Sequence, residues 1–190
     1  MKYQHIMLDT ETLGREADAV VLSIAMVKFN FGSGVSAETD SGIQVFPEVQ
    51  RQMKDRSMCW ATIQWWMEQS EDARCAMIQN EPYRMPMEWA LEKVRSYIDS
   101  KEYKVWANGA AFDPPLMRHL FTQYGIEEPW DFRRILDMRT MKWLSKFDSK
   151  SVPQRDNAVK HDALSDCFWQ IDVLNAEFNK IKGTPLEFKS

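Results

Sequence analysis

The fold and the chemistry of this chain are decided by residues 3–11, which read Tyr-Gln-His-Ile-Met-Leu-Asp-Thr-Glu. The apolar run at 3–8 predicts a short buried strand that ends where the polarity changes at Asp9. Residues i and i+2 of an extended chain project from one face, roughly 6–7 Å apart. Asp9 and Glu11 are therefore paired carboxylates, which repel each other unless a cation lies between them. Such oxygen ligands suit Mg²⁺ or Mn²⁺, although a solvated acidic turn has the same pattern.

Two further apolar runs extend this start into a sheet. The first covers Val20 to Phe29 and breaks at residues 30–34, Asn-Phe-Gly-Ser-Gly, and the second covers Gly42 to Phe46 before Pro47. Two such runs around a Gly-rich connection predict a hairpin. We therefore expect three antiparallel strands at the beginning of the chain.

Helical and strand patterns alternate through the rest of the sequence. Helices are predicted over Trp60–Gln69, Glu71–Gln79, a segment from Pro86 to Ile98, Asp113–Tyr124, Met138–Phe147 and Ala163–Ile181, and strands over Tyr103–Ala107 and Phe132–Leu136. In the first helix Trp60, Ile63 and Met67 fall on one stripe, and Trp89, Val94 and Ile98 do so in the third. This order predicts an α/β fold with a mixed five-stranded sheet flanked by helices. Residues 1–190 are expected to form one domain.

Composition limits the classes of function. The chain has 190 residues, 44% of them apolar and 27% charged, which is typical of a globular domain. Its net charge of −4 argues against a simple electrostatic nucleic-acid binder. It does not argue against an enzyme whose bound cations meet a phosphate. Cys59, Cys75 and Cys167 lack CxxC spacing, so we expect small buried residues and neither a disulfide framework nor a zinc site.

A third carboxylate, Asp113, follows the strand at Tyr103–Ala107 by way of Asn108 and Gly109. Because Asp113 precedes two prolines that open a helix, it is also a natural helix N-cap. Its position near a strand end favours a functional site, since such sites gather there.

A fourth segment, at residues 161–166, reads His-Asp-Ala-Leu-Ser-Asp. A five-residue step within a helix turns about 140°, so His161 and Asp166 can share a site only if His161 lies in the loop before the helix. A loop histidine suits a general base, and a histidine on a solvent-exposed loop is the plain alternative. Asp162 is a rival to Asp166, because the two would share a helix face at i,i+4.

Together these pieces resemble the three exonuclease motifs of the DnaQ-like (DEDDh) superfamily, in the family's order. The extended matches are residues 8–14, Leu-Asp-Thr-Glu-Thr-Leu-Gly, and 108–113, Asn-Gly-Ala-Ala-Phe-Asp. Residues 62–74, Thr-Ile-Gln-Trp-Trp-Met-Glu-Gln-Ser-Glu-Asp-Ala-Arg, are similar to one branch of that superfamily. The branch includes phage and prophage exonucleases of the exonuclease VIII-like type and a mycobacterial 3′→5′ exoribonuclease. The resemblance covers about residues 3–180 and shows no catalytic substitution.

The resemblance implies a ribonuclease H-like fold and a 3′→5′ exonuclease that releases nucleoside 5′-monophosphates from single-stranded DNA or RNA. It implies that four carboxylates hold two Mg²⁺ or Mn²⁺ ions, namely Asp9, Glu11, Asp113 and Asp166. His161 would deprotonate the attacking water, a role that suits its ordinary pKa of about 6.5. Substrate contacts are expected from Thr12, Leu13, Asn108 and Phe112, with Leu13 and Phe112 against the terminal base. The expected location is the cytoplasm of a bacterium or of a phage-infected host.

Two other features bear on the substrate. Residues 131–160 carry eight basic and four acidic side chains, a net +4 that fits either a phosphate-tracking flank or a solvated surface. Trp65 and Trp66 are adjacent in a helix and so lie about 100° apart, which lets one belong to the core and the other to a groove or a partner subunit.

Three alternatives stay open at this point. The chain is either an exonuclease, a nucleic-acid-binding module with weak or lost catalysis, or a phosphohydrolase of small nucleotides or short oligonucleotides. A proofreading exonuclease is disfavoured because no polymerase domain accompanies it. We expect no membrane contact, since no apolar run approaches the ~18 residues of a span. A homodimer is left open, with the Trp-rich helices as the candidate interface.

Overall fold

A computed structural model describes residues 3–32, 42–156 and 158–183, except for the side chains of 76–79. Its strands are β1 (His5–Thr12), β2 (Val21–Phe29), β3 (Gly42–Val45), β4 (Lys104–Ala107) and β5 (Ile135–Asp137). They form one sheet in the order β3-β2-β1-β4-β5. The first three strands pair antiparallel, whereas β4 is parallel to β1 and to β5. The predicted mixed five-stranded sheet is confirmed.

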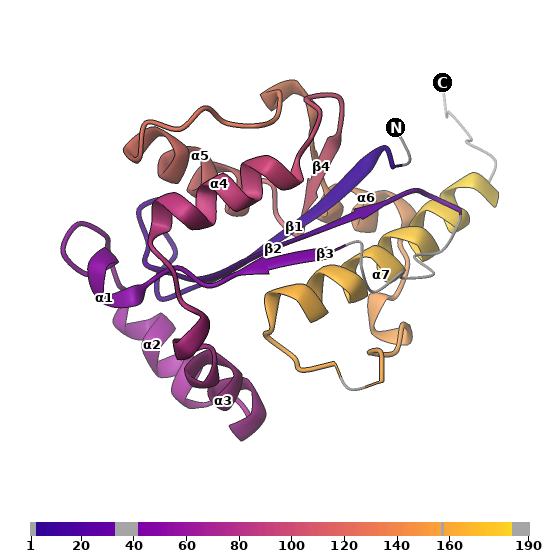
Figure 1. The fold of residues 1–190 in the computed structure, drawn as a ribbon. Helices are drawn as coiled ribbons and strands as arrows, with labels where there is room; N and C mark the ends of the chain where they lie inside the picture. The colour runs from indigo at the N-terminus through magenta and orange to yellow at the C-terminus, as the bar shows by residue number, and fades with distance from the viewer. Residues whose placement is uncertain (1–2, 33–41, 157, 184–190) are drawn as a thin grey trace.

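Helices cover both faces of this sheet (Figure 1). They are α1 (Val49–Gln52), α2 (Trp60–Met67), α3 (Glu71–Gln79), α4 (Met87–Tyr97), α5 (Asp113–Gln123), α6 (Met138–Ser145) and α7 (Ala163–Gly183), with 3₁₀ turns η2 (Glu81–Tyr83), η3 (Phe132–Arg134) and η4 (Ser149–Ser151). The α4 and α5 helices lie on one face, α6 and α7 on the other, and α1–α3 beyond one end of the strands. The structure therefore has three layers around a central sheet.

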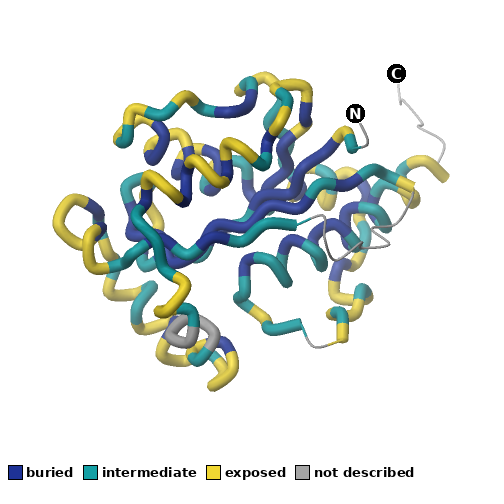
Figure 2. The backbone as a smooth tube through the Cα atoms, in the orientation of Figure 1, coloured by how far each residue is buried: buried dark blue, intermediate teal, exposed yellow. Residues whose placement is uncertain are grey.

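Alternate residues of β1 enter two different cores. Ile6 and Leu8 pack with α4 and α5, whereas Met7 packs with α7. The central strands are buried along most of their length (Figure 2). Because side chains of a strand alternate between faces, Asp9 and Glu11 continue the parity of Met7 and face α7. The strand period thus decides which helix these carboxylates meet.

The first strand is longer than its apolar run predicts. It was expected to end before Asp9, but it continues to Thr12, with Asp9 opposite Ala25 and Glu11 opposite Ser23 of β2. The pairing with a long, buried β2 extends the ladder past the polarity change. Both carboxylates therefore lie within a hydrogen-bonded strand instead of on the turn after it.

The predicted apolar stripe of α2 is wrong. Trp60 and Met67 are 69% and 63% exposed, while Trp66 is 4% exposed and donates from Nε1 to the carbonyl of Thr12 at 2.9 Å. The prediction for Trp89 of α4 is also wrong, because that side chain is 67% exposed. When a helix has apolar residues on several sides, its sequence does not decide which side is buried, and tertiary packing does.

Smaller differences concern β5 and the cysteines. The first half of the strand expected at 132–136 is the 3₁₀ turn η3, which begins where the Asp131 side chain accepts from Arg133 N. Cys167 is buried as expected, but Cys59 and Cys75 are only half-buried, and all three are free thiols. No helix in the described part of the chain is long and apolar enough to cross a membrane.

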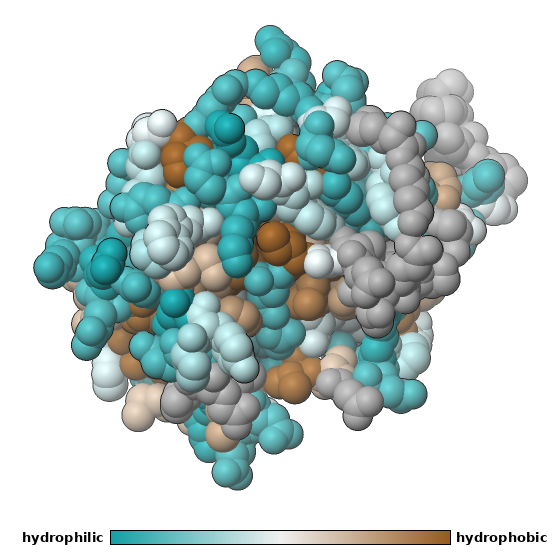
Figure 3. Space-filling view, viewed as in Figure 1, coloured by the Kyte–Doolittle hydropathy of each residue, from teal (hydrophilic) through white to brown (hydrophobic). Residues whose placement is uncertain are grey.

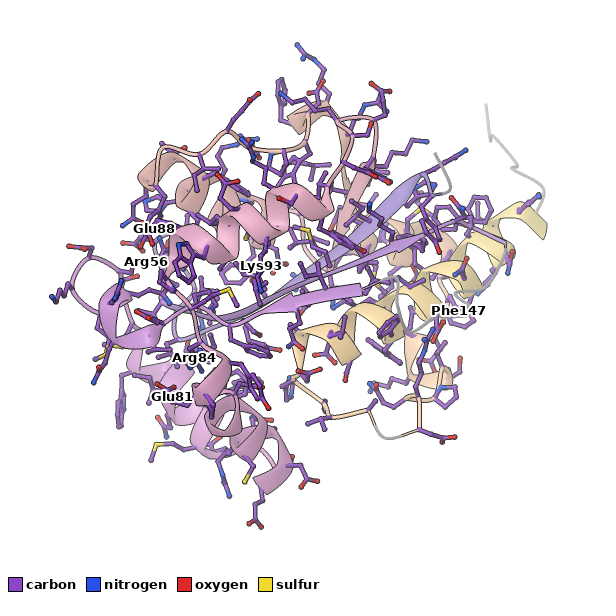
Figure 4. The ribbon with its side chains drawn as sticks, viewed as in Figure 1. Arg56, Glu81, Arg84, Glu88, Lys93 and Phe147 are labelled. Carbon is purple, nitrogen blue, oxygen red and sulfur yellow. The ribbon has the colours of Figure 1, made fainter. Side chains whose placement is uncertain are left out.

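One buried cation ties the α2–α3 region to the sheet. Arg84, which lies beside Glu81 (Figure 4), donates from Nη1 to the carbonyls of Leu22 at 3.0 Å and Pro47 at 2.9 Å. Its Nε donates to Glu81 at 2.7 Å, and its side chain is 5% exposed. These bonds fasten the segment after α3 to the edge of β2 and help to position α2 beside the end of β1.

Candidate active site

The candidate residues converge at one end of the sheet. In the parallel register of β1 and β4, Leu8 lies opposite Ala107, so Asn108 and the chain leading to α5 emerge beside Asp9. Asp113 and Asp166 lie in the first turns of α5 and α7. The partial positive charge of a helix N-terminus stabilises a carboxylate there. Two strand positions and two helix starts thus bring four carboxylates together.

Asp113 is bonded to the first strand. Its Oδ1 accepts from the backbone N of Thr10 at 3.1 Å and from Thr10 Oγ1 at 2.6 Å, and the side chain is 5% exposed. It is the first residue of α5, and the N-cap is Phe112, which makes no side-chain capping bond. The alternative that Asp113 caps its own helix is therefore wrong. Its carboxylate instead links the start of α5 to β1.

Asp9 has a partner that the sequence did not reveal. Gln170 Nε2 donates to Asp9 Oδ1 at 2.7 Å, and Gln170 is 3% exposed. Gln170 lies four residues after Asp166 on α7, so the two share a helix face. That spacing was the available signal, but an amide near a carboxylate motif has no specificity until the helix is placed against β1.

Three potential ligands form the tightest group. One ligand atom each from Glu11, His161 and Asp166 lies within 4.8 Å of the other two. His161 precedes α7 and has a left-handed backbone with φ of 65°. The expected loop position of His161 is confirmed, and it is what allows the histidine and Asp166 to meet. For a residue with a Cβ, positive φ is held only by surrounding contacts.

Asp162, the rival of Asp166, is occupied elsewhere. Its Oδ2 accepts from the backbone N and the Oγ of Ser165, both at 3.0 Å, at the start of α7. Its Oδ1 accepts from Gln44 Nε2 at 2.8 Å. Asp162 is thus an N-terminal cap of the last helix and is absent from the three-ligand group.

The described residues provide no ion pair for the four carboxylates, although Arg139 and Lys160 act on Asp113 and Asp166 from a greater distance. None of the ion pairs found in the described ranges involves Asp9, Glu11, Asp113 or Asp166. Burial, together with the neighbouring carboxylates, raises the pKa of Asp9 and that of Glu11 well above their ordinary values. Burial also raises the pKa of Asp113 and that of Asp166 to about 6 each. Uncompensated, closely packed oxygen ligands of this kind fit a divalent cation.

His161 is shaped by its aromatic neighbours. Its ring lies 4.7 Å from that of Trp65 and 6.2 Å from that of Trp66, both edge-on. Burial, and secondarily Lys160, lowers the pKa of His161 below its ordinary value, so the imidazole is neutral near pH 7. A neutral imidazole is able to accept a proton, which is what a general base requires.

A cavity of about 750 Å³ opens beside these groups. Three of the four carboxylates line it, those of Asp9, Glu11 and Asp166, whereas Asp113 does not. His161, Trp65, Asn108, Lys150, Lys160, Trp169 and Gln170 also belong to the lining. Of the four expected substrate contacts only Asn108 lines it. Thr12 is buried with its hydroxyl donating to Gly14 O at 2.7 Å, while Leu13 and Phe112 are half-buried outside the lining.

The basic stretch at 131–160 is not one continuous track. Arg134 pairs with Glu102, and Arg155 pairs with Asp172 through bonds of 2.7 and 2.8 Å. Of the eight basic side chains in this stretch, those of Lys150 and Lys160 line the cavity that the carboxylates also line. The face in Figure 3 is hydrophilic over most of its area, with hydrophobic side chains gathered near its centre.

Comparisons with known proteins find similarity to exonucleases. The model of the Rv2179c-like 3′-5′ exoribonuclease domain matches residues 4–177. An exodeoxyribonuclease of Enterobacteria phage T4 is 26% identical over 189 residues, covering 85% of this chain and 83% of its own. Among solved structures, the zinc-bound complex of E. coli exonuclease I with single-stranded DNA superposes with a TM-score of 0.62 at 13% identity, over 94% of this chain. Exonuclease I of Methylocaldum szegediense gives 0.62 at 14% identity, over 90% of this chain. The chain spans 42% and 39% of those two exonuclease I chains.

Proposed function

Because this chain belongs to the Rv2179c-like 3′-5′ exoribonuclease domain family, and is thus a DnaQ-like 3′-5′ exonuclease domain, we propose that it hydrolyses single-stranded nucleic acid with divalent cations. The product would be a nucleoside 5′-monophosphate. The observation that carries this proposal is the convergence of Glu11, His161 and Asp166 within 4.8 Å, beside Asp9 and Asp113. We further propose that residues 1–190 act as one exonuclease domain.

The carboxylates of Asp9, Glu11, Asp113 and Asp166 would hold two Mg²⁺ or Mn²⁺ ions. Cations bound there supply Lewis-acid stabilisation of the attacking and leaving oxygens of the phosphodiester. The chain contributes the carboxylate ligands. Thr10 restrains the Asp113 carboxylate through two hydrogen bonds. The pKa values of these carboxyls are raised because keeping them ionised in a buried cluster costs free energy. A bound cation would remove that cost.

His161 would act as the general base. Its ring is neutral and its ligand nitrogen lies within 4.8 Å of carboxylate oxygens of Glu11 and Asp166, so a water bound among them is within its reach. Trp65 closes one side of the ring. The loop position of His161 leaves it outside the helical hydrogen-bond ladder, on the cavity wall.

The substrate would be a strand and not a mononucleotide. The cavity of about 750 Å³ is lined by Lys150 and Lys160 as well as by carboxylates, and these lysines would meet phosphates flanking the scissile one. The complexes of exonuclease I with single-stranded DNA support DNA as one substrate class. The family's exoribonuclease description supports RNA as the other.

A homodimer is proposed on narrower grounds. Trp60 and Met67 are 69% and 63% exposed on α2, and large apolar side chains exposed together are typical of an interface. Light scattering of the wild type and of Trp60→Ser would measure the oligomeric state. A wild-type protein that is monomeric at micromolar concentration would exclude this dimer.

The proposed reaction is tested with 3′- and 5′-labelled single-stranded DNA and RNA in Mg²⁺, Mn²⁺ or EDTA. We expect stepwise shortening from the 3′ end and release of 5′-monophosphates only with a divalent cation. Activity that survives EDTA, or shortening from the 5′ end, would contradict the proposal. Binding of strands without cleavage would favour the alternative of a nucleic-acid-binding module. Cleavage restricted to dinucleotides and short oligomers would favour the phosphohydrolase.

A further inference from the structure

Gln170 is a buried amide that contacts a proposed cation ligand. It lies on α7, is 3% exposed, and donates from Nε2 to Asp9 Oδ1 at 2.7 Å. It also lines the cavity. A buried glutamine is uncommon unless its amide is used, because leaving amide groups without partners costs free energy. The position therefore calls for a reason beyond helix packing.

The orientation of this amide follows from chemistry. When Asp9 is ionised, as a cation ligand is, turning the amide over would set two oxygens 2.7 Å apart with no proton between them, so the nitrogen faces Asp9. The bond occupies Oδ1 and leaves Oδ2 of Asp9 for other partners.

The donor is neutral, and its neutrality matters. A lysine or arginine at this position would hold Asp9 equally firmly but would cancel the charge that attracts a cation. An amide fixes the carboxylate and leaves its negative charge intact. Thr10 does the same for Asp113 with a hydroxyl and a backbone N–H. Two carboxylates of the site are thus restrained by uncharged donors.

The other end of the amide is unfinished. Gln170 Oε1 is buried and has no hydrogen-bond partner in the described structure. A buried carbonyl oxygen without a donor costs roughly 1–3 kcal/mol. A water molecule that also contacts a bound cation would satisfy it. The amide then bridges Asp9 on one side and the hydration shell of the cation on the other.

We propose that Gln170 is a positioning residue that holds the Asp9 carboxylate for divalent-cation binding and accepts a hydrogen bond from the cation's water. This proposal rests on the proposed cation-dependent function of the same site. Asp166 and Gln170 lie one helical turn apart on α7. The helix thus provides one proposed cation ligand, Asp166, and the amide that holds a second ligand, Asp9. The competing explanation is that Gln170 only helps α7 to pack against β1.

The test compares Gln170→Met with a matched control, Gln52→Met. Gln52, in α1, is also a buried glutamine, 2% exposed, and its amide exchanges two hydrogen bonds of 2.8 Å with the backbone of Val21; it does not line the cavity beside the carboxylates. Both changes remove buried amide hydrogen bonds, so both should lower thermal stability. Only Gln170→Met should weaken cation binding.

The readout is Mn²⁺ affinity, measured by electron paramagnetic resonance or calorimetry on the full chain without substrate. We expect Gln170→Met to raise the dissociation constant about 10-fold or more, in the range typical of lost outer-shell hydrogen bonds. Gln52→Met should leave it unchanged. An unchanged Mn²⁺ affinity in Gln170→Met would overturn the inference, and equal weakening in both variants would assign the effect to stability.

A second measurement on the wild-type chain keeps the inference testable if Gln170→Met does not fold. The side-chain amide of Gln170, labelled with ¹⁵N, should change its chemical shift when Mg²⁺ saturates the site and when Asp9 is replaced by alanine. A resonance that responds to neither would overturn the role. Wild-type protein that binds no Mn²⁺ at all would instead contradict the proposed function, so the two failures are distinguishable.

Discussion

The two ends of β1 solve the problem of burying titratable groups in opposite ways. At one end His5 is 6% exposed, accepts a hydrogen bond from Trp106 Nε1 at 3.0 Å, and packs against Phe29 and Phe31. Burial lowers its pKa to about 4, so it is neutral at pH 7. At the other end Asp9 and Glu11 are packed with more carboxylates, and neither forms an ion pair with any of the described residues.

The difference separates stabilisation from function. The aromatic end keeps His5 neutral and gives its Nδ1 a donor in Trp106 Nε1, an arrangement that favours folding. The acidic end keeps groups that repel each other, which costs folding free energy unless a cation is bound. Both ends belong to one strand, β1, which is held in the sheet by its pairing with β2 and β4. Strain concentrated at one end of a well-packed strand is typical of an active site.

The largest expected effect comes from removing a carboxylate at the acidic end. Asp9→Ala or Asp166→Asn should lower turnover by about 10³-fold or more, because each ligand contributes several kcal/mol of charge stabilisation through the cation. The measurement is release of nucleotides from a labelled strand with saturating Mg²⁺. Circular dichroism should show an unchanged fold.

Asp99→Asn is the matched control for this prediction. Asp99 is an exposed carboxylate that pairs with Lys28 at 3.2 Å. Its replacement should leave turnover as in the wild type. A similar loss in both variants would mean that general charge, and not the cluster, controls the rate.

The two histidines provide the next comparison. His161→Ala should lower turnover about 10²-fold, the lower range for loss of a general base, while Mn²⁺ affinity stays within a few fold. His5→Phe at the aromatic end should cost about 1–3 kcal/mol of stability, because Trp106 Nε1 loses its acceptor, and should not change turnover. Unaltered turnover in His161→Ala would show that another group is the base.

A smaller effect is expected from the ring that contacts His161. Trp65 is 38% exposed, its ring lies 4.7 Å from that of His161, and it lines the cavity. Trp65→Ala should lower turnover about 10-fold by letting the imidazole leave its reactive position, and Trp65→Phe should restore most of it. Trp89→Ala, on an exposed tryptophan of α4, is the control and should behave as wild type.

The smallest effect is a pH dependence of stability with opposite signs at the two ends. The pKa values of Asp113 and Asp166 are about 6 when folded, above the unfolded value of about 4. Without cations the folded state binds these protons more tightly, so stability from this end is lost as pH rises from about 4 to about 6. The folded pKa of His5, about 4, is below its unfolded value of about 6.5, so stability from that end is lost as pH falls through this window.

Thermal unfolding of the cation-free protein between pH 4 and pH 8 measures both contributions. Asp166→Asn should raise the free energy of unfolding at pH 7 by about 1 kcal/mol, or roughly 2–4 °C in Tm, and flatten the acidic-end dependence. His5→Phe should remove the loss toward low pH. Addition of Mg²⁺ should stabilise the wild type at pH 7 and not Asp166→Asn. A wild-type Tm that is insensitive to Mg²⁺ would contradict the cation site.

The positions of some site residues could be predicted from the sequence because they depend on a local pattern. The i,i+2 spacing of Asp9 and Glu11 places both on one face of any strand, whether or not the strand ends there. A five-residue step turns about 140° in a helix, which predicts that His161 lies outside the last helix, and in the structure it lies in the preceding loop with φ of 65°. The five-stranded mixed sheet followed from the order of the elements.

The roles of other residues could not be predicted from the sequence, because they depend on which helices and strands pack against each other. Trp60 and Trp66 are the same residue type in one helix, yet Trp60 is exposed and Trp66 is buried, with its Nε1 donating to the carbonyl of Thr12. The net charge of +4 over residues 131–160 predicted a basic flank, but Arg155 forms an ion pair with Asp172 of α7. Leu13 and Phe112 adjoin the carboxylates in sequence and yet lie outside the cavity lining.

The sequence by itself determined the alternation of strands and helices, the pairing of carboxylates on β1 and the class of chemistry. These depend on periods of two and 3.6 residues and on the identity of the side chains. Only the tertiary structure decided that Gln170 restrains Asp9, that Asp162 caps α7 while Asp166 joins the cluster, and that His5 lies neutral at the far end. Contacts between residues up to 161 positions apart are determined by packing of the layers, which no local period encodes.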